Sequence, residues 1–169
     1  MKVELGSGGK DTWTEGYKHL DVRNIGGLDY VSDIRDLPFK DGEVEEFLAY
    51  HVLEHVGRED AKKVLSECYR CLKTNGTLLI KCPNLYYNAL EYVKLRQEQF
   101  KNDSVENVQR IYDLVGWFYG GQDYEENIHK FIFDFWVLKE FLISAGFRIV
   151  DFMRGFNFNT QNLGIVAIK

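Results

Sequence analysis

The chain has 169 residues, a length typical of one domain that buries about two thirds of its unfolded surface in a single core. Hydrophobic residues make up 45% of it and only two residues are proline, so a folded globule is expected and long disordered tracts are excluded. The net charge of -5 is spread along the chain without the Lys/Arg cluster of a nucleic-acid-binding surface, and no stretch is apolar and long enough for a membrane span.

Strands and helices are predicted to alternate along the first half of the chain. Four segments have the composition of strands, namely residues 2–5, 17–22, 30–34 and 44–50. Apolar residues at three- and four-residue spacing predict a helix over 58–73, which the sequence KTNG at 73–76 is expected to close. The apolar run 77–82 predicts a fifth strand, buried on both faces and ended by Pro83.

The second half predicts three more helices and two final strands. The helices are expected at residues 85–100, 104–118 and 134–145. Asp134 can cap the start of the last helix, and Gly146 follows its end. The strands expected at 147–153 and 163–169 are only about ten residues apart, too close for a helical crossover, so they should pair antiparallel. This order of elements predicts an α/β domain with a mostly parallel sheet.

A glycine-rich segment, GSGG at residues 6–9, follows the first strand. Because glycine has no Cβ, the chain can turn sharply there and let a ligand approach the backbone. A P-loop would need a glycine at Glu4 and a hydroxyl side chain at Asp11, and the dinucleotide fingerprint would place Asp11 at its third glycine, near the pyrophosphate. A ligand without phosphate groups fits better, although glycine turns without any ligand are equally common.

Two aspartates follow the glycine segment at the ends of predicted strands. Asp21 ends the second strand, where nucleotide-binding α/β folds place an acidic residue that accepts hydrogen bonds from both ribose hydroxyls. Asp33 follows the third strand and could accept a hydrogen bond from an adenine amino group. Each aspartate alone is typical of a turn or cap, but their order and spacing after the glycine segment favour a binding site.

Five segments stand in order along most of the chain: VELGSGG, HLDV, SDIRDLPFKDGEVEEFLAYHVLEHV, ECYRCLKTNGTLLIKCPN and LISAGF. Together they resemble the class I S-adenosylmethionine-dependent methyltransferases, in particular the small bacterial type 11 group. The resemblance implies a Rossmann-like fold with a seven-stranded, mostly parallel sheet of order 3-2-1-4-5-7-6 and an antiparallel last hairpin. It also implies methyltransferase activity with S-adenosylmethionine as the cofactor.

The resemblance assigns roles to individual residues. The cofactor-binding residues that it implies are Glu4, Gly6, Ser7, Gly8, Asp21, Val22, Asp33, Ile34, Tyr50 and His51. Residues 6–8 would pack against the methionine and ribose part, and Asp21 would hold the ribose. Residues 33–34 would bracket the adenine, and Tyr50 with His51 would lie beside the sulfonium.

The chain departs from the family pattern near the first strand. Lys10 replaces the third glycine of the loop, and about eight residues separate Gly8 from the second strand, so the first crossover helix must be short or missing. The N-terminal helices that cover the substrate in many relatives are absent, so we expect the lid to come from elsewhere. These departures leave open a protein of methyltransferase fold that binds the cofactor without catalysis.

Residues 84–133 are a candidate for the substrate side. They fill about fifty positions where a crossover needs about a dozen, and α/β folds build substrate sites at the carboxyl ends of their strands. One interpretation is an acceptor pocket, with Tyr119, Gln122, His129 and Lys130 as its candidate residues. The other is a surface hairpin and a helix pair that complete the core.

Methyl transfer asks mainly for orientation, which can supply roughly 7 to 11 kcal/mol of the barrier. A base is needed mainly when the acceptor is a hydroxyl or a protonated amine. His51 and His129 are the candidate catalytic bases, and proximity without a base is the alternative. We expect a small-molecule or saccharide acceptor methylated on oxygen or nitrogen. A looser resemblance to methyltransferases found with surface-polysaccharide genes favours a sugar hydroxyl.

A zinc hydrolase is a competing interpretation, because His51, Glu54 and His55 form the sequence H-x-x-E-H. That site needs a helix through both histidines and a third protein ligand, whereas the predicted fourth strand runs directly into His51. Cys68 and Cys71 fall on the apolar stripe of their helix and are expected in the core. We therefore expect no metal, and Glu54 and His55 as residues of the junction between strand and helix.

The three cysteines suggest a reducing compartment. Their number is odd, and the glycine segment follows the first residues too closely to leave room for a signal peptide. Free thiols in a cytoplasmic protein are therefore expected.

Overall fold

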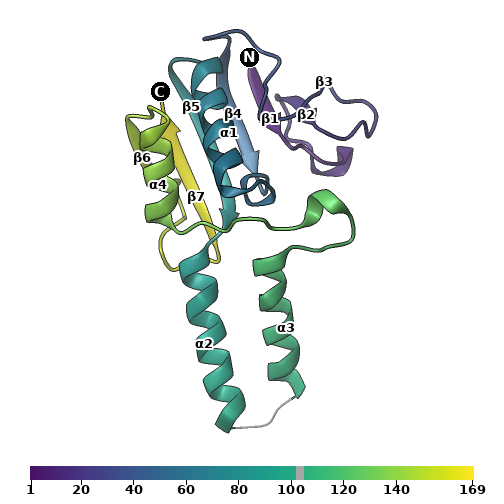
Figure 1. The fold of residues 1–169 in the computed structure, drawn as a ribbon, viewed down its shortest axis with the longest axis vertical. Coiled ribbons are helices and arrows are strands. Elements are labelled where there is room, and N and C mark those ends of the chain that lie inside the picture. The colour runs from purple at the N-terminus through teal and green to yellow at the C-terminus, as the bar shows by residue number, and fades with distance from the viewer. Residues whose placement is uncertain (102–104) are drawn as a thin grey trace.

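Seven strands form one sheet in the computed structural model, which describes residues 1–101 and 105–169. Their order is β3-β2-β1-β4-β5-β7-β6 (Figure 1). The strands are β1 (Lys2–Leu5), β2 (Lys18–Asp21), β3 (Tyr30–Val31), β4 (Val44–Tyr50), β5 (Leu72–Pro83), β6 (Ile149–Phe152) and β7 (Asn162–Ile168). Neighbours from β3 to β5 pair in parallel, whereas β7 pairs antiparallel with β5 and β6. The predicted α/β fold, strand order and antiparallel last hairpin are confirmed.

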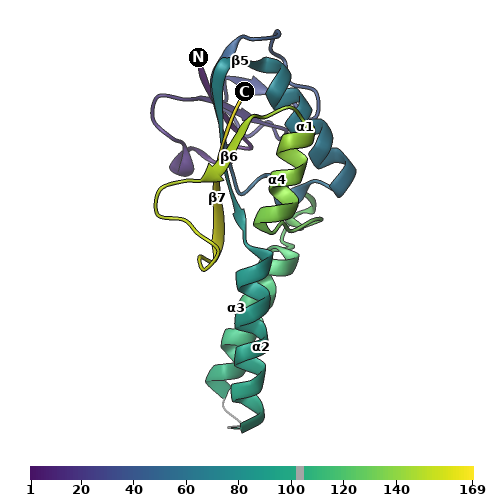
Figure 2. The ribbon, with the colours of Figure 1, turned by 90° about the vertical axis from the view of Figure 1, so that its left-hand side faces the viewer.

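Two helices, α1 (Arg58–Cys71) and α4 (Phe135–Ser144), cover one face of the sheet (Figure 2). The apolar side chains that α1 buries have the predicted spacing; they are Ala61, Val64, Leu65, Cys68 and Cys71. Asp134 caps α4 by accepting a hydrogen bond of 2.9 Å from the Val137 amide, and Gly146 follows the helix with φ +107°. The main core lies between these helices and the sheet, and its largest fully buried side chains include Phe47, Phe133, Phe147, Leu138 and Leu142.

The other face of the sheet is covered differently. Among the described residues, only loops and the three-residue 3-10 turn η1 (Lys10–Thr12) lie over it (Figure 2), so the first crossover is as short as expected. In β5, Leu78, Ile80 and Cys82 are buried but Leu79 is only half-buried. The prediction that this strand is buried on both faces is therefore wrong, because no described helix packs over the second face.

Several element boundaries differ from the prediction. The sequence KTNG at 73–76 lies in β5 instead of closing α1, which ends earlier. The register of β5 against β4 shifts between Val44 and Glu46, and Asn75 adopts φ +62°. This irregularity allows residues that are typical of turns to lie within the strand. Strands β2, β3 and β6 are shorter than predicted. Ser104, the predicted start of a helix, lies outside the described residues.

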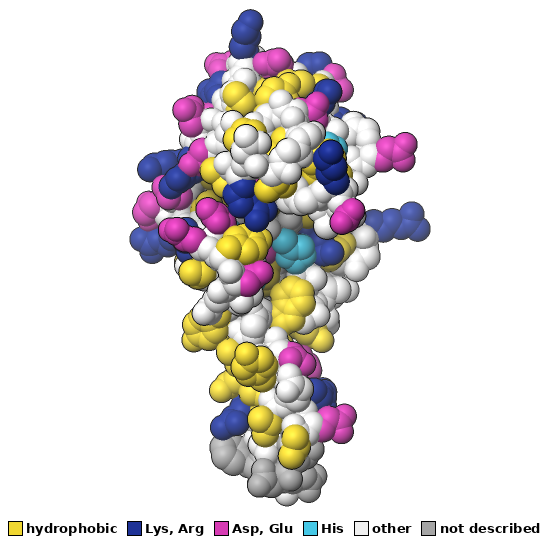
Figure 3. Space-filling view, turned by 90° about the vertical axis from the view of Figure 1, so that its right-hand side faces the viewer, with side chains coloured by type: hydrophobic (Ala, Val, Ile, Leu, Met, Phe, Trp, Pro, Cys, Tyr) yellow, Lys and Arg dark blue, Asp and Glu magenta, His cyan; other side chains and the backbone are white. Residues whose placement is uncertain are grey.

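Helices α2 (Leu85–Lys101) and α3 (Val105–Tyr119) form a hairpin that projects beyond the carboxyl end of β5 (Figure 1). An isolated bridge between Asn84 and Phe133 joins the two ends of this insertion at its base. Three buried side chains form a small core of its own: Leu95, Ile111 and Leu114. Other apolar side chains of the hairpin are exposed, and Figure 3 shows hydrophobic side chains gathered on its surface; they include Tyr86, Leu90, Val93, Val105, Val108, Tyr112 and Tyr119. Within the described part of the chain, none of the helices has the length and apolar character needed to cross a membrane.

Candidate active site

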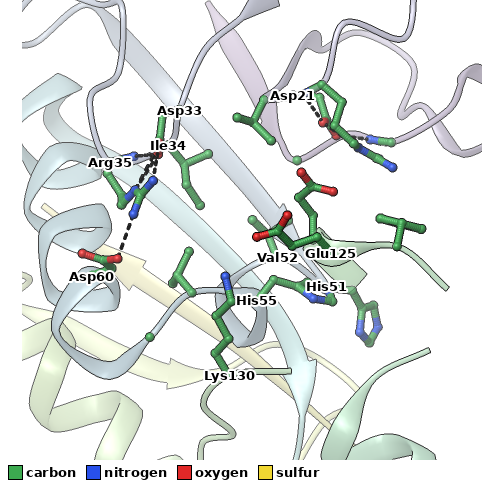
Figure 4. A pocket seen from close by; sticks show the side chains of 18 residues that line it. Asp21, Asp33, Ile34, Arg35, His51, Val52, His55, Asp60, Glu125 and Lys130 are labelled. Carbon is green, nitrogen blue, oxygen red and sulfur yellow. Dashed lines mark hydrogen bonds and ion pairs between the residues drawn. The ribbon is translucent and has the colours of Figure 1, made fainter. Parts of the chain in front are cut away.

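A cavity of about 530 Å³ opens where β1, β2 and β4 end (Figure 4). This volume is in the range of small-molecule sites. The predicted cofactor residues that line it are Gly6, Gly8, Asp21, Val22, Asp33, Ile34 and His51. They come from consecutive strand ends, which meet at one edge of a parallel sheet.

The glycine loop is shaped by two residues with positive φ, Gly6 at +56° and Gly8 at +61°. A Cβ atom on Gly6 would lie 2.6 Å from Val52 Cγ2, so no larger residue fits without moving the chain that follows β4. The Gly8 amide donates a hydrogen bond of 3.0 Å to Asp21 Oδ2. An amide that already binds a carboxylate is not free for a phosphate, which agrees with the expectation of a phosphate-free ligand.

Asp21 is only 4% exposed and lies at the cavity wall. Its carboxylate also accepts hydrogen bonds from the amide and Nε of Arg23, at 2.9 and 3.2 Å. Burial alone would raise the pKa of Asp21, but the hydrogen bonds from Arg23 and Gly8 outweigh it and hold the pKa below the ordinary value. Asp21 is therefore ionised at neutral pH, as an acceptor for hydroxyl groups should be.

Asp33 is held in a similar way by an arginine two residues later. Arg35 Nη2 donates to Asp33 Oδ2 at 2.6 Å, and its Nη1 donates to Asp60 Oδ2 at 2.9 Å (Figure 4). These hydrogen bonds from Arg35 lower the pKa of Asp33. Arg23, Arg35 and Asp60 also line the cavity. None of the three was predicted as a site residue. The repeated pattern Asp-x-Arg in the sequence was the signal that could have found both arginines.

Three predicted cofactor residues lie outside the cavity lining. The Glu4 carboxylate binds the amide and hydroxyl of Thr14, both at 2.9 Å, and His19 Nδ1 lies 3.1 Å from it. Tyr50 has the Lys81 ammonium 5.9 Å from its ring centroid. The third residue, Ser7, is buried. Side chains alternate along a strand, so Glu4 and Tyr50 project from their strands toward the face that carries η1.

The sequence H-x-x-E-H does not form a continuous helix. Strand β4 ends before His51, which has φ +54°, and residues Leu53–His55 form the 3-10 turn η2. Glu54 is fully buried, and its Oε1 lies 3.1 Å from His51 Nδ1. His55 Nδ1 lies 3.2 Å from the Ile128 carbonyl oxygen, and burial keeps the pKa of His55 below its usual value. The positive φ of His51 is a strained conformation for a residue other than glycine and costs about 1 to 3 kcal/mol. Such strain is common at functional sites.

The insertion returns to the sheet along this cavity. Residues 124–126, at the start of the 3-10 turn η3 (Glu125–Asn127), line the cavity, and so does Lys130. The Tyr124 ring lies over the Arg23 guanidinium at 4.8 Å from the centroid. The amides of Lys130 and Phe131 both donate to the Glu54 carbonyl oxygen, at 2.7 and 3.2 Å. These contacts fix the return segment as a wall of the cavity, which sequence reasoning missed because they join distant parts of the chain.

A second cavity of about 810 Å³ lies between the bases of α2 and α3 and the return segment. Its lining is mainly apolar and aromatic, and includes Tyr92, Val93, Phe118 and Phe131. The predicted substrate residues Tyr119, His129 and Lys130 line it. Gln122 is exposed and lines neither cavity. Lys130 lines both cavities, so they adjoin at this residue.

Known proteins share both the fold and part of the sequence pattern. A family model described as a methyltransferase domain matches residues 11–80. A methyltransferase from Thermotoga maritima, described as a possible histamine N-methyltransferase, aligns with TM-score 0.63 and 19% identity over 99% of this chain and 81% of that chain. A methyltransferase from Archaeoglobus fulgidus aligns with TM-score 0.61 and 17% identity over 99% of this chain and 85% of that chain. No curated protein matches.

A third solved structure contains ligands. It is the 1,6-didemethyltoxoflavin N1-methyltransferase of Burkholderia thailandensis with its substrate and S-adenosylhomocysteine, at TM-score 0.57 and 13% identity over 99% of this chain and 70% of that chain. At these identities the structural likeness shows the fold, which is that of the class I enzymes. The domain match over residues 11–80 and the shared fold agree with the resemblance of the sequence to the class I methyltransferases that use S-adenosylmethionine.

Proposed function

We propose that this methyltransferase binds its cofactor in the 530 Å³ cavity and methylates an oxygen or nitrogen atom of a small molecule or saccharide held in the adjoining 810 Å³ groove. The observation that carries the proposal is the junction of the two cavities at Lys130. One cavity is lined by carboxylates and glycines, and the other is mainly apolar. A polar cofactor and a ring-shaped acceptor would meet at that junction.

The lining residues fit S-adenosylmethionine. Asp21 is an ionised acceptor for the ribose hydroxyls, and Asp33 with Ile34 would bracket the adenine. Gly6 and Gly8 present bare backbone to the methionine end. The carboxylates of the lining outnumber its three cations, Arg23, Arg35 and Lys130, and the resulting net negative charge suits a ligand with a cationic centre.

The cofactor supplies an electrophilic methyl group, and the protein has to orient the acceptor and take up its proton. His51 lines the cavity, and its Nδ1 faces buried Glu54 at 3.1 Å. When Nδ1 carries the proton, Nε2 is free to accept one from a hydroxyl or ammonium group, while Glu54 stabilises the cation that forms. His129 is the second candidate base, and its Nδ1 lies 2.9 Å from the Trp117 carbonyl oxygen.

The aromatic lining of the groove supports a ring-shaped acceptor. Tyr92, Phe118, Tyr119 and Phe131 offer flat faces for a sugar or an aromatic ring. Residues 84–133 would therefore form the substrate side of the enzyme. Small-molecule acceptors are named for two proteins of this fold, the possible histamine N-methyltransferase and the toxoflavin enzyme. The buried free thiols of Cys68, Cys71 and Cys82 support a cytoplasmic location.

Binding of the cofactor without catalysis is a second candidate function. It is favoured by the first crossover, whose helical part is reduced to the three residues of η1, with Lys10 at the position of the third loop glycine. In this case the protein would act as a partner or sensor that depends on the cofactor.

Calorimetry followed by a turnover assay separates these functions. We expect S-adenosylmethionine and S-adenosylhomocysteine to bind, and S-adenosylhomocysteine to be released when a panel of monosaccharides, phenols and aromatic amines is added. Binding without release for any acceptor class would favour the non-catalytic function. No binding of either cofactor form would contradict both.

A further inference from the structure

Three side chains that could hold a metal ion converge beside the two cavities. Glu54, His55 and His129 each offer one ligand atom, and these atoms lie within 4.8 Å of one another. Two imidazoles and one carboxylate form a ligand set typical of Zn²⁺ and of other divalent transition metals. We propose that Glu54, His55 and His129 form a binding site for one divalent transition-metal ion.

The two histidines are held as metal ligands usually are. His55 Nδ1 lies 3.2 Å from the Ile128 carbonyl oxygen, and His129 Nδ1 lies 2.9 Å from the Trp117 carbonyl oxygen. Because a carbonyl only accepts, each Nδ1 must carry the proton, which leaves both Nε2 atoms with a free lone pair. A backbone carbonyl behind the ring is the common outer partner of a metal-bound histidine, since it fixes the tautomer and the ring orientation.

The carboxylate supplies an independent reason for a cation. Glu54 is 0% exposed, and its Oε1 faces His51 at 3.1 Å. Its Oε2 is buried and has no hydrogen-bond partner among the described residues. An unpaired buried carboxylate oxygen is costly, and a metal ion held by the two neighbouring imidazoles would satisfy it.

The site differs from the zinc-peptidase site that the sequence H-x-x-E-H suggests. No third ligand lies near the motif in the sequence, and His129 supplies it from the return segment of the insertion. His51, the first histidine of the motif, is not in the ligand set and lines the cofactor cavity. The expectation of no metal was based on the strand that runs into His51 and on the place of Cys68 and Cys71 in the core, and it did not combine His129 with Glu54 and His55.

The place of the site suggests its use. His55 lines the cofactor cavity and His129 lines the aromatic groove. With three protein ligands, the ion keeps an open position for an oxygen atom of the acceptor and lowers the pKa of a bound hydroxyl, whose proton passes to His51 or to water. This use rests on the proposed function, whereas binding of the ion does not.

The test is binding of Zn²⁺ and Co²⁺ to the full chain after treatment with a chelator. We expect one ion per chain by competition titration, and a Co²⁺ visible spectrum typical of four or five ligands. His129→Gln keeps an amide that can donate to the Trp117 carbonyl but loses the ligand, and Glu54→Gln removes the charge. Each should weaken binding by at least about a hundredfold, more than the loss of an outer partner usually does.

His19→Gln is the matched control, because His19 lies outside the ligand set, and it should bind the ion as the wild type does. S-adenosylhomocysteine binding checks that His129→Gln is folded, since His129 does not line the cofactor cavity. The proposal is overturned if the wild type binds no ion, or if the two ligand variants bind it as tightly as His19→Gln. Failure of the proposed function would appear separately, as absence of S-adenosylhomocysteine binding to a wild type that binds the metal.

Discussion

The cavity proposed for the cofactor and the aromatic groove are built in different ways. The cavity is formed by short loops at the ends of β1, β2 and β4, whose backbone and carboxylates are fixed by hydrogen bonds such as Gly8 to Asp21. The groove lies between the return segment and two helices whose own core has three buried residues among those the structure describes, and many of their apolar side chains are exposed. The comparison suggests a rigid cofactor side and an acceptor side that depends on a few side chains. Variants of the two regions should therefore affect different steps, cofactor binding in one case and acceptor binding in the other.

The largest expected effect is on the chemical step. His51→Gln removes the proposed base but fills a similar volume, so kcat for a hydroxyl acceptor should fall by roughly 10²- to 10⁴-fold, the usual contribution of a general base. Steady-state kinetics over a range of pH would measure this. A kcat within a few-fold of the wild type would indicate that proximity alone is enough.

The next largest effect is on cofactor affinity. Asp21→Ala removes an ionised acceptor held by Arg23 and Gly8, and the Kd for S-adenosylhomocysteine should rise at least about tenfold, because charge-assisted hydrogen bonds contribute about 1.5 to 3 kcal/mol each. Calorimetry would measure the change. Asp151→Ala, at an exposed position of the edge strand β6, is the control and should leave the Kd unchanged. If both variants bind S-adenosylhomocysteine with equal affinity, Asp21 does not hold the ribose.

A smaller effect should be confined to the groove. Tyr119→Ala removes an aromatic side chain from the groove lining, and the KM for the acceptor should rise several-fold, by the roughly 1 kcal/mol of one aromatic contact, at unchanged cofactor Kd. Tyr112→Ala, also on α3 but outside the lining and 74% exposed, is the matched control. If both variants change the KM equally, the acceptor does not lie in the groove.

The smallest effect concerns acid stability of the cavity edge. The pKa of Asp21 in the folded protein is below the ordinary aspartate value of 3.8, so the folded state binds fewer protons and its stability falls as the pH drops below that value. Arg23→Gln should weaken this dependence, because it removes the Nε hydrogen bond and the positive charge beside Asp21 and keeps only the bond from the backbone amide. Thermal unfolding of both proteins between about pH 7 and pH 3 would test it. If the stability of both proteins falls equally with decreasing pH, the Arg23 side chain does not stabilise the ionised Asp21.

Sequence reasoning found the parts of the site that are local in the chain. The glycine loop, Asp21 and Asp33 were predictable because each follows directly from a strand end. Glu4 and Tyr50 were assigned to the cavity because their place in a motif was known, whereas the direction of each side chain depends on the pleat of its strand. The contacts of Lys130 and His129 with residues 54–55 could not be predicted, since they join the insertion to the end of β4.

Burial of β5 was another non-local property. Its apolar run is the same whether a helix covers one face or both, and the helix that is missing belongs to the crossover between β1 and β2. The strand order was predictable because it followed from a resemblance that covers most of the chain.

The bridge between Asn84 and Phe133 has a consequence for how this enzyme can change. It returns the chain to the sheet at the point where it left, so the length of the helical hairpin is independent of the strand order. Loop closure costs only about 0.6 kcal/mol for each doubling of length. Turns of helix can therefore be added to or removed from the far end of α2 and α3 while β5 and α4 keep their places. Such a module could change in length without rebuilding the cavity at the ends of β1, β2 and β4.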